Sequence, residues 1–120
     1  MKQSNTLANG FIKAFVDGAK GLLVIDNPQR KNAITAAMWR AIPDAIHWLH
    51  AEAGARVIVL AGGGQVDFSA GADISEFTEL RKDAATARIY EASNSRDFAA
   101  IRVAPIPVIA TVRGICYGGG

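Results

Sequence analysis

Two glycine-rich stretches, each following an apolar, β-branched run, constrain the fold of this chain more than any other feature. Eight of its twelve glycines lie within residues 62–71 and 114–120, and the runs at 57–61 and 108–112 come shortly before them. Continuously apolar runs of this length are typical of strands that are covered on both faces. The sequence therefore predicts two buried strands, each of which ends in a turn with little side-chain bulk.

A β-hairpin is expected over residues 11–25, ahead of these two strands. The dipeptide Asp17-Gly18 separates two apolar runs, and glycine accepts the positive φ that a tight turn requires. Pro28 follows the second run and ends that strand, because proline has no N–H to donate to a neighbouring strand.

A long helix is expected between the hairpin and the first buried strand. Thr35 is its predicted N-cap, and the helix runs to about Ala53, with Gly54 as its stop. Apolar residues recur along it at helical spacing: Met38, Ile42, Ala45, Ile46 and Leu49. Pro43 lies inside this helix, where a proline costs about 3 kcal/mol. Either the helix bends there, or a first turn ends at Ile42 and a new helix starts at Pro43.

A second helix is predicted over residues 86–103. The residues expected on one face of it are Ala87, Tyr90, Asn94, Phe98 and Ile101. Pro105 and Pro107 mark its end. The predicted order is therefore β-β-α-β-α-β, which is typical of an α/β fold with parallel strands and right-handed crossovers.

The composition excludes several classes of protein. Thirteen Lys and Arg against eleven Asp and Glu give a net charge of +2, which is too small to indicate a nucleic-acid groove or a polybasic membrane anchor. No apolar run is long enough for a transmembrane helix, and the N-terminus leads into no apolar core of a secretion signal. The single cysteine, Cys116, excludes an internal disulfide and fits a reducing compartment, so a cytoplasmic location is expected.

The positions of the glycines suggest chemistry at one edge of the sheet. Ligands of open α/β sheets bind in the crevice outside the carboxyl ends of the parallel strands. Glycine lets a carbonyl or a phosphate approach the main chain without a Cβ in the way, and two N–H groups aimed at one oxygen form an oxyanion hole. Tight packing of the turns explains the same glycines equally well. The run Gly62-Gly63-Gly64 lacks the Lys-Ser/Thr of a P-loop, which disfavours nucleotide hydrolysis.

Three segments carry a family resemblance. Residues 26–34 read Asp-Asn-Pro-Gln-Arg-Lys-Asn-Ala-Ile, and residues 68–74 after the strand at 57–60 read Phe-Ser-Ala-Gly-Ala-Asp-Ile. Residues 107–110 read Pro-Val-Ile-Ala and lead through Gly114 to the final Gly-Gly-Gly. In order and spacing, these segments resemble the enoyl-CoA hydratase/isomerase (crotonase) family, from about residue 11 to the last residue. The resemblance implies a crotonase-like spiral of ββα units, with residues 1–120 as the N-terminal part of a single domain.

The resemblance also implies the residues of a site. Two backbone N–H groups that stabilise the enolate of a CoA thioester match Ala72 and Gly119. The residues that would line the CoA arm are Ala70, Ala72, Asp73, Ile74 and Ser75. Arg30 and Lys31 would lie beside the adenosine end, where their charges either meet phosphate or belong to a solvated surface. No metal or cofactor is implied, since CoA is part of the substrate.

The activity implied is that of an enoyl-CoA hydratase, which adds water to a 2-enoyl-CoA. Hydratases of the family use two glutamates as acid and base, and both positions would lie beyond Gly120, so the chain is expected to be part of a longer protein. An enoyl-CoA isomerase is the close alternative, since the same N–H donors serve both reactions. A non-catalytic CoA-binding or assembly module is an alternative of another class, and a generic phosphate-binding α/β domain is a poorer one. The full-length protein is expected to form a homotrimer or hexamer, with no nucleic-acid or membrane partner.

Three other sets of side chains invite chemical interpretations that the sequence does not favour. Asp73 and Glu76 are expected to cap a helix start rather than to act as an acid/base pair. His47 and His50 have too few neighbouring ligands for a metal site and are expected at the surface or partly packed. Cys116 is expected to be buried as a small packing residue.

Overall fold

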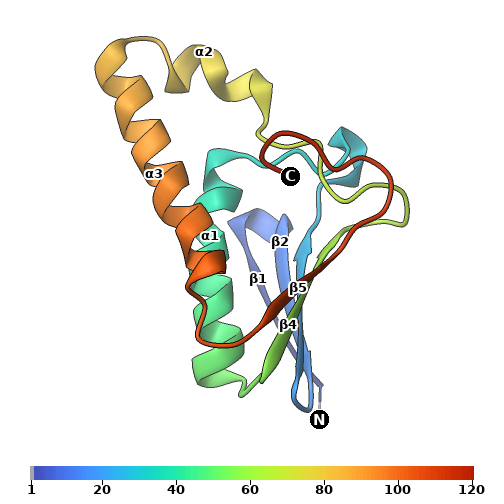
Figure 1. Ribbon diagram of the computed structural model, residues 1–120. Helices are drawn as coiled ribbons and strands as arrows, with labels where there is room; N and C mark the ends of the chain where they lie inside the picture. The colour runs from blue at the N-terminus through green and yellow to red at the C-terminus, as the bar shows by residue number, and fades with distance from the viewer. Residues whose placement is uncertain (1) are drawn as a thin grey trace.

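The computed structural model, which describes residues 2–120, has a five-stranded sheet with helices on one face (Figure 1). The strands are β1 (Lys2–Leu7), β2 (Ile12–Asp17), β3 (Lys20–Ile25), β4 (Val57–Gly62) and β5 (Val108–Thr111). The helices are α1 (Ala36–His47), α2 (Phe77–Leu80) and α3 (Ala84–Arg102).

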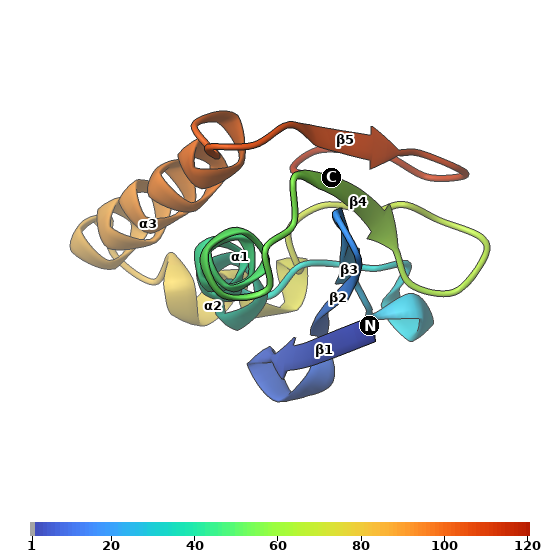
Figure 2. The same ribbon diagram turned by 90° about the horizontal axis from the view of Figure 1, so that it is seen from below.

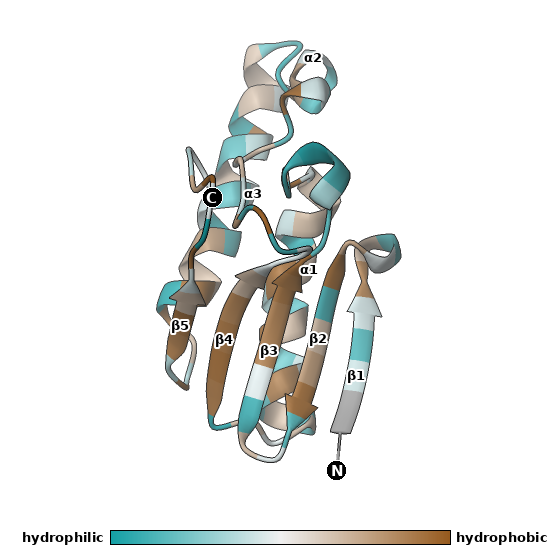
Figure 3. Ribbon diagram, turned by 90° about the vertical axis from the view of Figure 1, so that its right-hand side faces the viewer, coloured by the Kyte–Doolittle hydropathy of each residue, from teal (hydrophilic) through white to brown (hydrophobic). Residues whose placement is uncertain are grey.

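The strands lie in the order of the chain, from β1 at one edge to β5 at the other (Figure 3). β1 pairs with β2 and β2 with β3 in antiparallel fashion, whereas β3, β4 and β5 are parallel. The predicted hairpin is confirmed: Asp17 pairs with Lys20, and Gly18 in the turn has φ of +62°. The α/β architecture is confirmed as well, because α1 joins β3 to β4 and α3 joins β4 to β5.

The core lies between the sheet and α1. Alternate residues of the strands point to the helices and are buried, as Ile12 and Ala14 of β2 and Ile58 and Leu60 of β4 illustrate. Each large aliphatic side chain buried in this way contributes about 1.5–3 kcal/mol. Figure 2 shows α1 and α3 side by side on the same side of the sheet. The five apolar positions predicted for the first helix are all buried in this layer.

Helix α1 begins where the sequence predicts. The Thr35 side chain accepts a hydrogen bond from the Met38 N–H at 3.2 Å, as an N-cap does. The helix continues through Pro43 to His47, so the alternative of a new helix starting at Pro43 is wrong. Because most of α1 is buried against the sheet, packing outweighs the hydrogen bond that Pro43 cannot make. A π-helical turn, Trp48–Glu52, extends the helix to Gly54, which has φ of +76°.

Several expectations about burial are wrong. The second glycine-rich stretch follows β5, which forms an edge of this sheet, and three of the four β5 residues are exposed rather than buried. Cys116 lies in the loop after β5 and is exposed for the same reason. In β4 only the face toward the helices is fully buried. Strand β1 was not predicted, since the polar residues of an edge strand carry little hydrophobic periodicity.

No helix among residues 2–120 combines the length and the apolar character that a crossing of a lipid bilayer requires.

Candidate functional site

Three loop segments lie side by side beyond the carboxyl ends of the parallel strands. The first, residues 31–34, leads into α1, the second, 67–73, follows β4, and the third, 113–120, follows β5. The Ala70 N–H donates to the Lys31 carbonyl at 2.9 Å, which joins the first segment to the second. The Tyr117 N–H donates to the Ser69 carbonyl at 3.1 Å, which joins the second to the third. The sequence prediction that the two glycine-rich stretches meet at one edge of the sheet is confirmed.

The Ala72 N–H is turned away from the first segment. Residues 34 and 72 form an isolated parallel bridge, in which the Ile34 N–H donates to the Gly71 carbonyl at 2.8 Å and the Asp73 N–H donates to the Ile34 carbonyl at 2.9 Å. Successive N–H groups of an extended segment point to opposite sides. The Ala72 N–H therefore points away from Ile34, and it donates to no protein group in the described residues.

The Gly119 N–H lies against the second segment. A Cβ added to Gly71 would lie 3.0 Å from the Gly119 nitrogen and 2.7 Å from the Tyr117 oxygen. Only a residue without a side chain allows this approach, and Gly71 also has φ of +95°. Gly119, like Ala72, donates its N–H to no group within residues 2–120. One unpaired amide thus lies at the contact between Gly71 and Gly119, and the other belongs to Ala72, the residue after Gly71.

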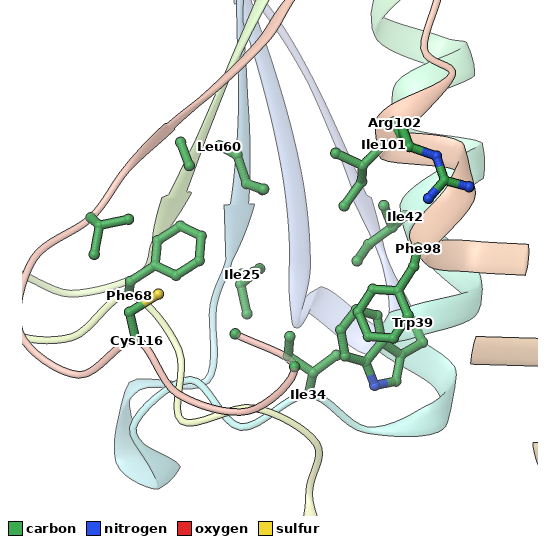
Figure 4. A pocket seen from close by; sticks show the side chains of 14 residues that line it. Ile25, Ile34, Trp39, Ile42, Leu60, Phe68, Phe98, Ile101, Arg102 and Cys116 are labelled. Carbon is green, nitrogen blue, oxygen red and sulfur yellow. The ribbon is translucent and has the colours of Figure 1, made fainter. Parts of the chain in front are cut away.

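An apolar cavity of about 350 Å³ lies beside Gly119 (Figure 4). The Trp39 and Phe98 rings form one wall, in an edge-to-face pair with centroids 4.3 Å apart. Phe68 and Cys116 lie on the opposite side of the space in Figure 4. A Cβ added to Gly119 would lie 3.0 Å from the Trp39 ring. The Gly119 amide therefore lies where the polar main chain of the loops meets an apolar space.

Asp73 fixes the main chain directly after Ala72. Its side chain is buried and accepts hydrogen bonds from the Ser75 hydroxyl at 2.6 Å and from the Ser75 N–H at 2.9 Å. The hydroxyl of Ser75, its N–H and the Arg30 guanidinium stabilise the carboxylate and hold the pKa of Asp73 below its usual value. The expectation of a capping role for Asp73 is confirmed, because it is the N-cap of a short 3₁₀ turn, Ile74–Glu76.

The remaining residues expected at the CoA arm lie around this turn. Arg30 donates to Asp73 at 3.4 Å and to Ser75 at 3.3 Å, yet 60% of its side chain is exposed. Lys31 is exposed beside a hollow of about 70 Å³ formed with the loop after β4. Ala70 is half-buried, and Ile74 is 76% exposed. Hydrogen bonds thus join Arg30 to Asp73 and Ser75, and Ala70 to Lys31, on either side of Ala72 in the chain.

Glu76 has a capping role in another helix. Its Oε1 accepts a hydrogen bond from the Ala36 N–H, 2.7 Å away, at the first turn of α1. The Glu76 carboxylate is therefore occupied by a hydrogen bond that holds the fold, as the Asp73 carboxylate is. His47 and His50 are exposed on and just after α1, as expected, and the described residues hold no group of three side chains that could bind a metal ion.

Sequence reasoning missed the buried polar residues whose side chains hydrogen-bond to the main chain of these loops. Asn27, Asn32 and Ser69 are buried, and their side chains hydrogen-bond across the loops. Both asparagines lie in the motif at 26–34, where they contributed only to the resemblance. A signal was present, because two asparagines spaced by five residues in a segment with a proline indicate a turn held by side-chain hydrogen bonds.

Comparisons with known proteins give these observations a context. The family model described as enoyl-CoA hydratase/isomerase matches residues 19–120. The chain is 32% identical to the crotonyl-CoA hydratase of Syntrophomonas wolfei over 99 residues, which are 82% of this chain and 37% of that protein. It is 30% identical to the mitochondrial Δ(3,5)-Δ(2,4)-dienoyl-CoA isomerase of Mus musculus over 105 residues, which are 80% of this chain and 32% of that protein.

Solved structures agree with the sequence comparison. A crystal structure of an enoyl-CoA hydratase/carnithine racemase from Magnetospirillum magneticum superposes with a TM-score of 0.85 at 35% identity, covering 91% of this chain and 41% of that one. The chain thus spans about 40% of the length of the relatives it matches, at their N-terminal end.

Proposed function

Since the chain belongs to the enoyl-CoA hydratase/isomerase family and has its α/β crotonase fold, we propose that it supplies the oxyanion hole of a CoA-thioester enzyme. The donors are the backbone N–H groups of Ala72 and Gly119. One observation carries this proposal: the Gly119 N–H, at the close contact with Gly71, and the N–H of Ala72, the next residue after Gly71, both have no protein partner in the described residues. Chemistry that places negative charge on a thioester oxygen requires donors of this kind.

The surface beside Ala72 is the proposed CoA arm. Ala70 and residues 72–75 would line it, with the exposed Ile74 side chain as an apolar contact. Arg30 and Lys31 would contact phosphate groups at the adenosine end, since both are exposed cations on the segment that precedes α1. CoA is part of the substrate, so the proposal needs no further cofactor.

The reaction that we propose for the full-length protein is hydration of a 2-enoyl-CoA. An acid and a base would come from residues beyond Gly120, because Asp73 and Glu76 are committed to hydrogen bonds that hold the loop and α1. Removal or addition of a proton next to a thioester uses the same N–H donors, so an isomerase is the alternative within the family. The two relatives described above include one of each kind.

The commitment of Asp73 and Glu76 favours a second candidate, a non-catalytic CoA-binding or assembly module. Such a module would hold a thioester in the same donors and transform nothing. The homotrimer or hexamer and the cytoplasmic location expected from the sequence stay predictions that accompany both candidates.

Calorimetric titration of the 120-residue chain with two matched ligands tests the proposal. Butyryl-CoA carries the thioester oxygen, whereas S-butyl-CoA is the thioether without it. A net hydrogen bond contributes about 0.5–1.5 kcal/mol, so two donors make the thioester bind more tightly by roughly 5-fold to 150-fold. In ¹H–¹⁵N spectra, butyryl-CoA alone is expected to shift the Ala72 and Gly119 signals. Equal affinities with no selective shift of these signals would rule out the oxyanion hole.

A further inference from the structure

We propose that Asn32 is a positioning residue that holds the Ala72 and Gly119 amides in place, through its main-chain carbonyl and its buried carboxamide; this inference rests on the proposed function. Asn32 is 1% exposed. The Oδ1 atom of Asn32 accepts from the Asn27 N–H at 2.8 Å. Its Nδ2 donates to the Gly63 carbonyl at 3.0 Å and to the Asp67 carbonyl at 2.8 Å.

Only one orientation of the carboxamide satisfies these partners. A flipped amide would place Oδ1 against two carbonyl oxygens and Nδ2 against an N–H group. Both Nδ2 hydrogens are used, and their acceptors lie at residues 63 and 67, in the first part of the loop after β4. A buried donor that lost its acceptor would be strongly unfavourable, so the side chain fixes the span from residue 63 to residue 67.

The main chain of Asn32 reaches the first amide. Its carbonyl accepts from the Ser69 hydroxyl at 2.7 Å, and this hydroxyl accepts from the Gly71 N–H at 3.1 Å. Gly71 precedes Ala72, and its carbonyl is held by Ile34. Gly71, whose carbonyl carbon is bonded to the Ala72 nitrogen, is therefore held by Ile34 at its carbonyl and by Asn32, through Ser69, at its N–H.

The second amide is reached through the loop that the carboxamide clamps. Asp67, whose carbonyl accepts from Asn32, uses its Oδ1 to accept from the Ile115 N–H at 2.9 Å. Ser69 holds Tyr117 through its carbonyl. Tyr117 in turn accepts from the Gly120 N–H at 2.8 Å, which closes the turn that contains Gly119. Displacement of residues 67–69 would move this turn along with them.

The variant Asn32→Asp tests the inference with minimal change of shape. It keeps an oxygen for the Asn27 N–H and replaces both Nδ2 donors with an acceptor that faces two carbonyls. Asn9→Asp is the matched control, because Asn9 has the same φ of +57° as Asn32 but is exposed and far from the loops in sequence. Ser69→Ala is the second variant, in case Asn32→Asp does not fold.

Two measurements distinguish positioning from a general role in stability. The first is the dissociation constant of S-butyl-CoA divided by that of butyryl-CoA. Loss of donor alignment in Asn32→Asp is expected to lower this ratio by about three- to tenfold, which corresponds to one weakened hydrogen bond. A merely structural role would weaken both ligands equally and leave the ratio unchanged. The second is the pair of Ala72 and Gly119 amide shifts in ligand-free protein, which are expected to move in Asn32→Asp and Ser69→Ala but not in Asn9→Asp.

The outcomes separate the two proposals. A wild-type ratio of one overturns the proposed oxyanion hole, and the ligand-free amide shifts then still decide whether Asn32 positions these groups. A wild-type ratio above one that persists in Asn32→Asp, with both amide shifts unchanged, overturns the role of Asn32. If Asn32→Asp is unfolded, an unchanged ratio and unchanged shifts in Ser69→Ala overturn it in the same way.

Discussion

Gly71 is the residue at which the two glycine-rich loops touch. Its positive φ and the approach of the Gly119 nitrogen both require the absence of a side chain, and these two requirements are separable by mutation. Gly10 provides the comparison, since it has φ of +88° but no atom within 4 Å of an added Cβ.

Gly71→Ala is expected to destabilise the chain more than Gly10→Ala does. Both variants place an L-residue at positive φ, at a cost of about 1–2 kcal/mol. Gly71→Ala also forces both the Tyr117 carbonyl and the Gly119 nitrogen away from residue 71. Such overpacking adds about 1–3 kcal/mol. Urea unfolding of both variants measures the difference, and equal costs would contradict the close contact.

The sequence anticipated the glycines better than the polar residues around them. A glycine in a turn after a strand is a local signal, and it correctly predicted where the main chain comes close. The roles of Asn32 and Ser69 depend on acceptors 31 to 37 positions away along the chain. Periodicity and turn propensity contain no information about such partners.

The start of helix α1 is stabilised by one residue next to it in the chain and by one distant residue. Thr35 caps it from the neighbouring position, as the sequence predicts. Glu76 caps the same turn from 40 positions further along the chain. A carboxylate near the N-terminus of a helix is also favoured by the helix dipole.

Glu76→Ala is therefore expected to destabilise the chain by about 1 kcal/mol, the typical cost of a lost N-cap hydrogen bond. Glu76→Gln retains an acceptor and is expected to lose less. Glu79→Ala is the control, because Glu79 is exposed and its ion pair with Lys82 is of the kind that contributes little. Thermal unfolding of the three variants measures these differences; a Glu76→Ala variant as stable as Glu79→Ala would show that the cap contributes nothing.

Helix α3 shows the limit of periodicity for an element. Its existence was predicted within two residues at either end, and the predicted face does pack inward: Tyr90 is buried, Phe98 pairs with Trp39 of α1, and Ile101 packs against the core. Phe98, expected on the buried face, is 41% exposed, whereas Asp97 is fully buried with its Oδ2 unpaired among residues 2–120. Periodicity therefore predicted the packed face, whereas the burial of the charged Asp97 carries no hydrophobic signal in the sequence.

At the scale of the whole molecule, an apolar edge lies open. Ile109 in β5 and Val112 just after it are each more than half exposed, next to the loop that carries Gly119. Monomeric proteins rarely leave large contiguous apolar surfaces uncovered. The chain spans about 40% of the length of its relatives. Gly119, one of the two proposed donors, lies on the loop that follows this exposed edge strand.

Residues 1–120 alone are expected to show no hydration of crotonyl-CoA. The oxyanion donors lower the barrier only when an acid and a base move the protons, and the nearby carboxylates of Asp73 and Glu76 are committed to hydrogen bonds. Loss of the ultraviolet absorbance of the conjugated thioester measures the reaction. The crotonyl-CoA hydratase of S. wolfei serves as the positive control, and robust turnover by the 120 residues would contradict the placement of the acid and base beyond Gly120.

The sequence by itself determined the hairpin, the start of α1 and the parallel strands that end in glycine-rich turns. These features arise from the φ preferences of glycine and proline, from capping and from hydrophobic periodicity, all of which act between near neighbours. Only the tertiary structure decided which amides keep their N–H groups free, which asparagine clamps the loops and which strand is left at the edge. Each of these depends on hydrogen bonds and burial between segments 30 or more residues apart, and such partners are chosen by the packed fold as a whole.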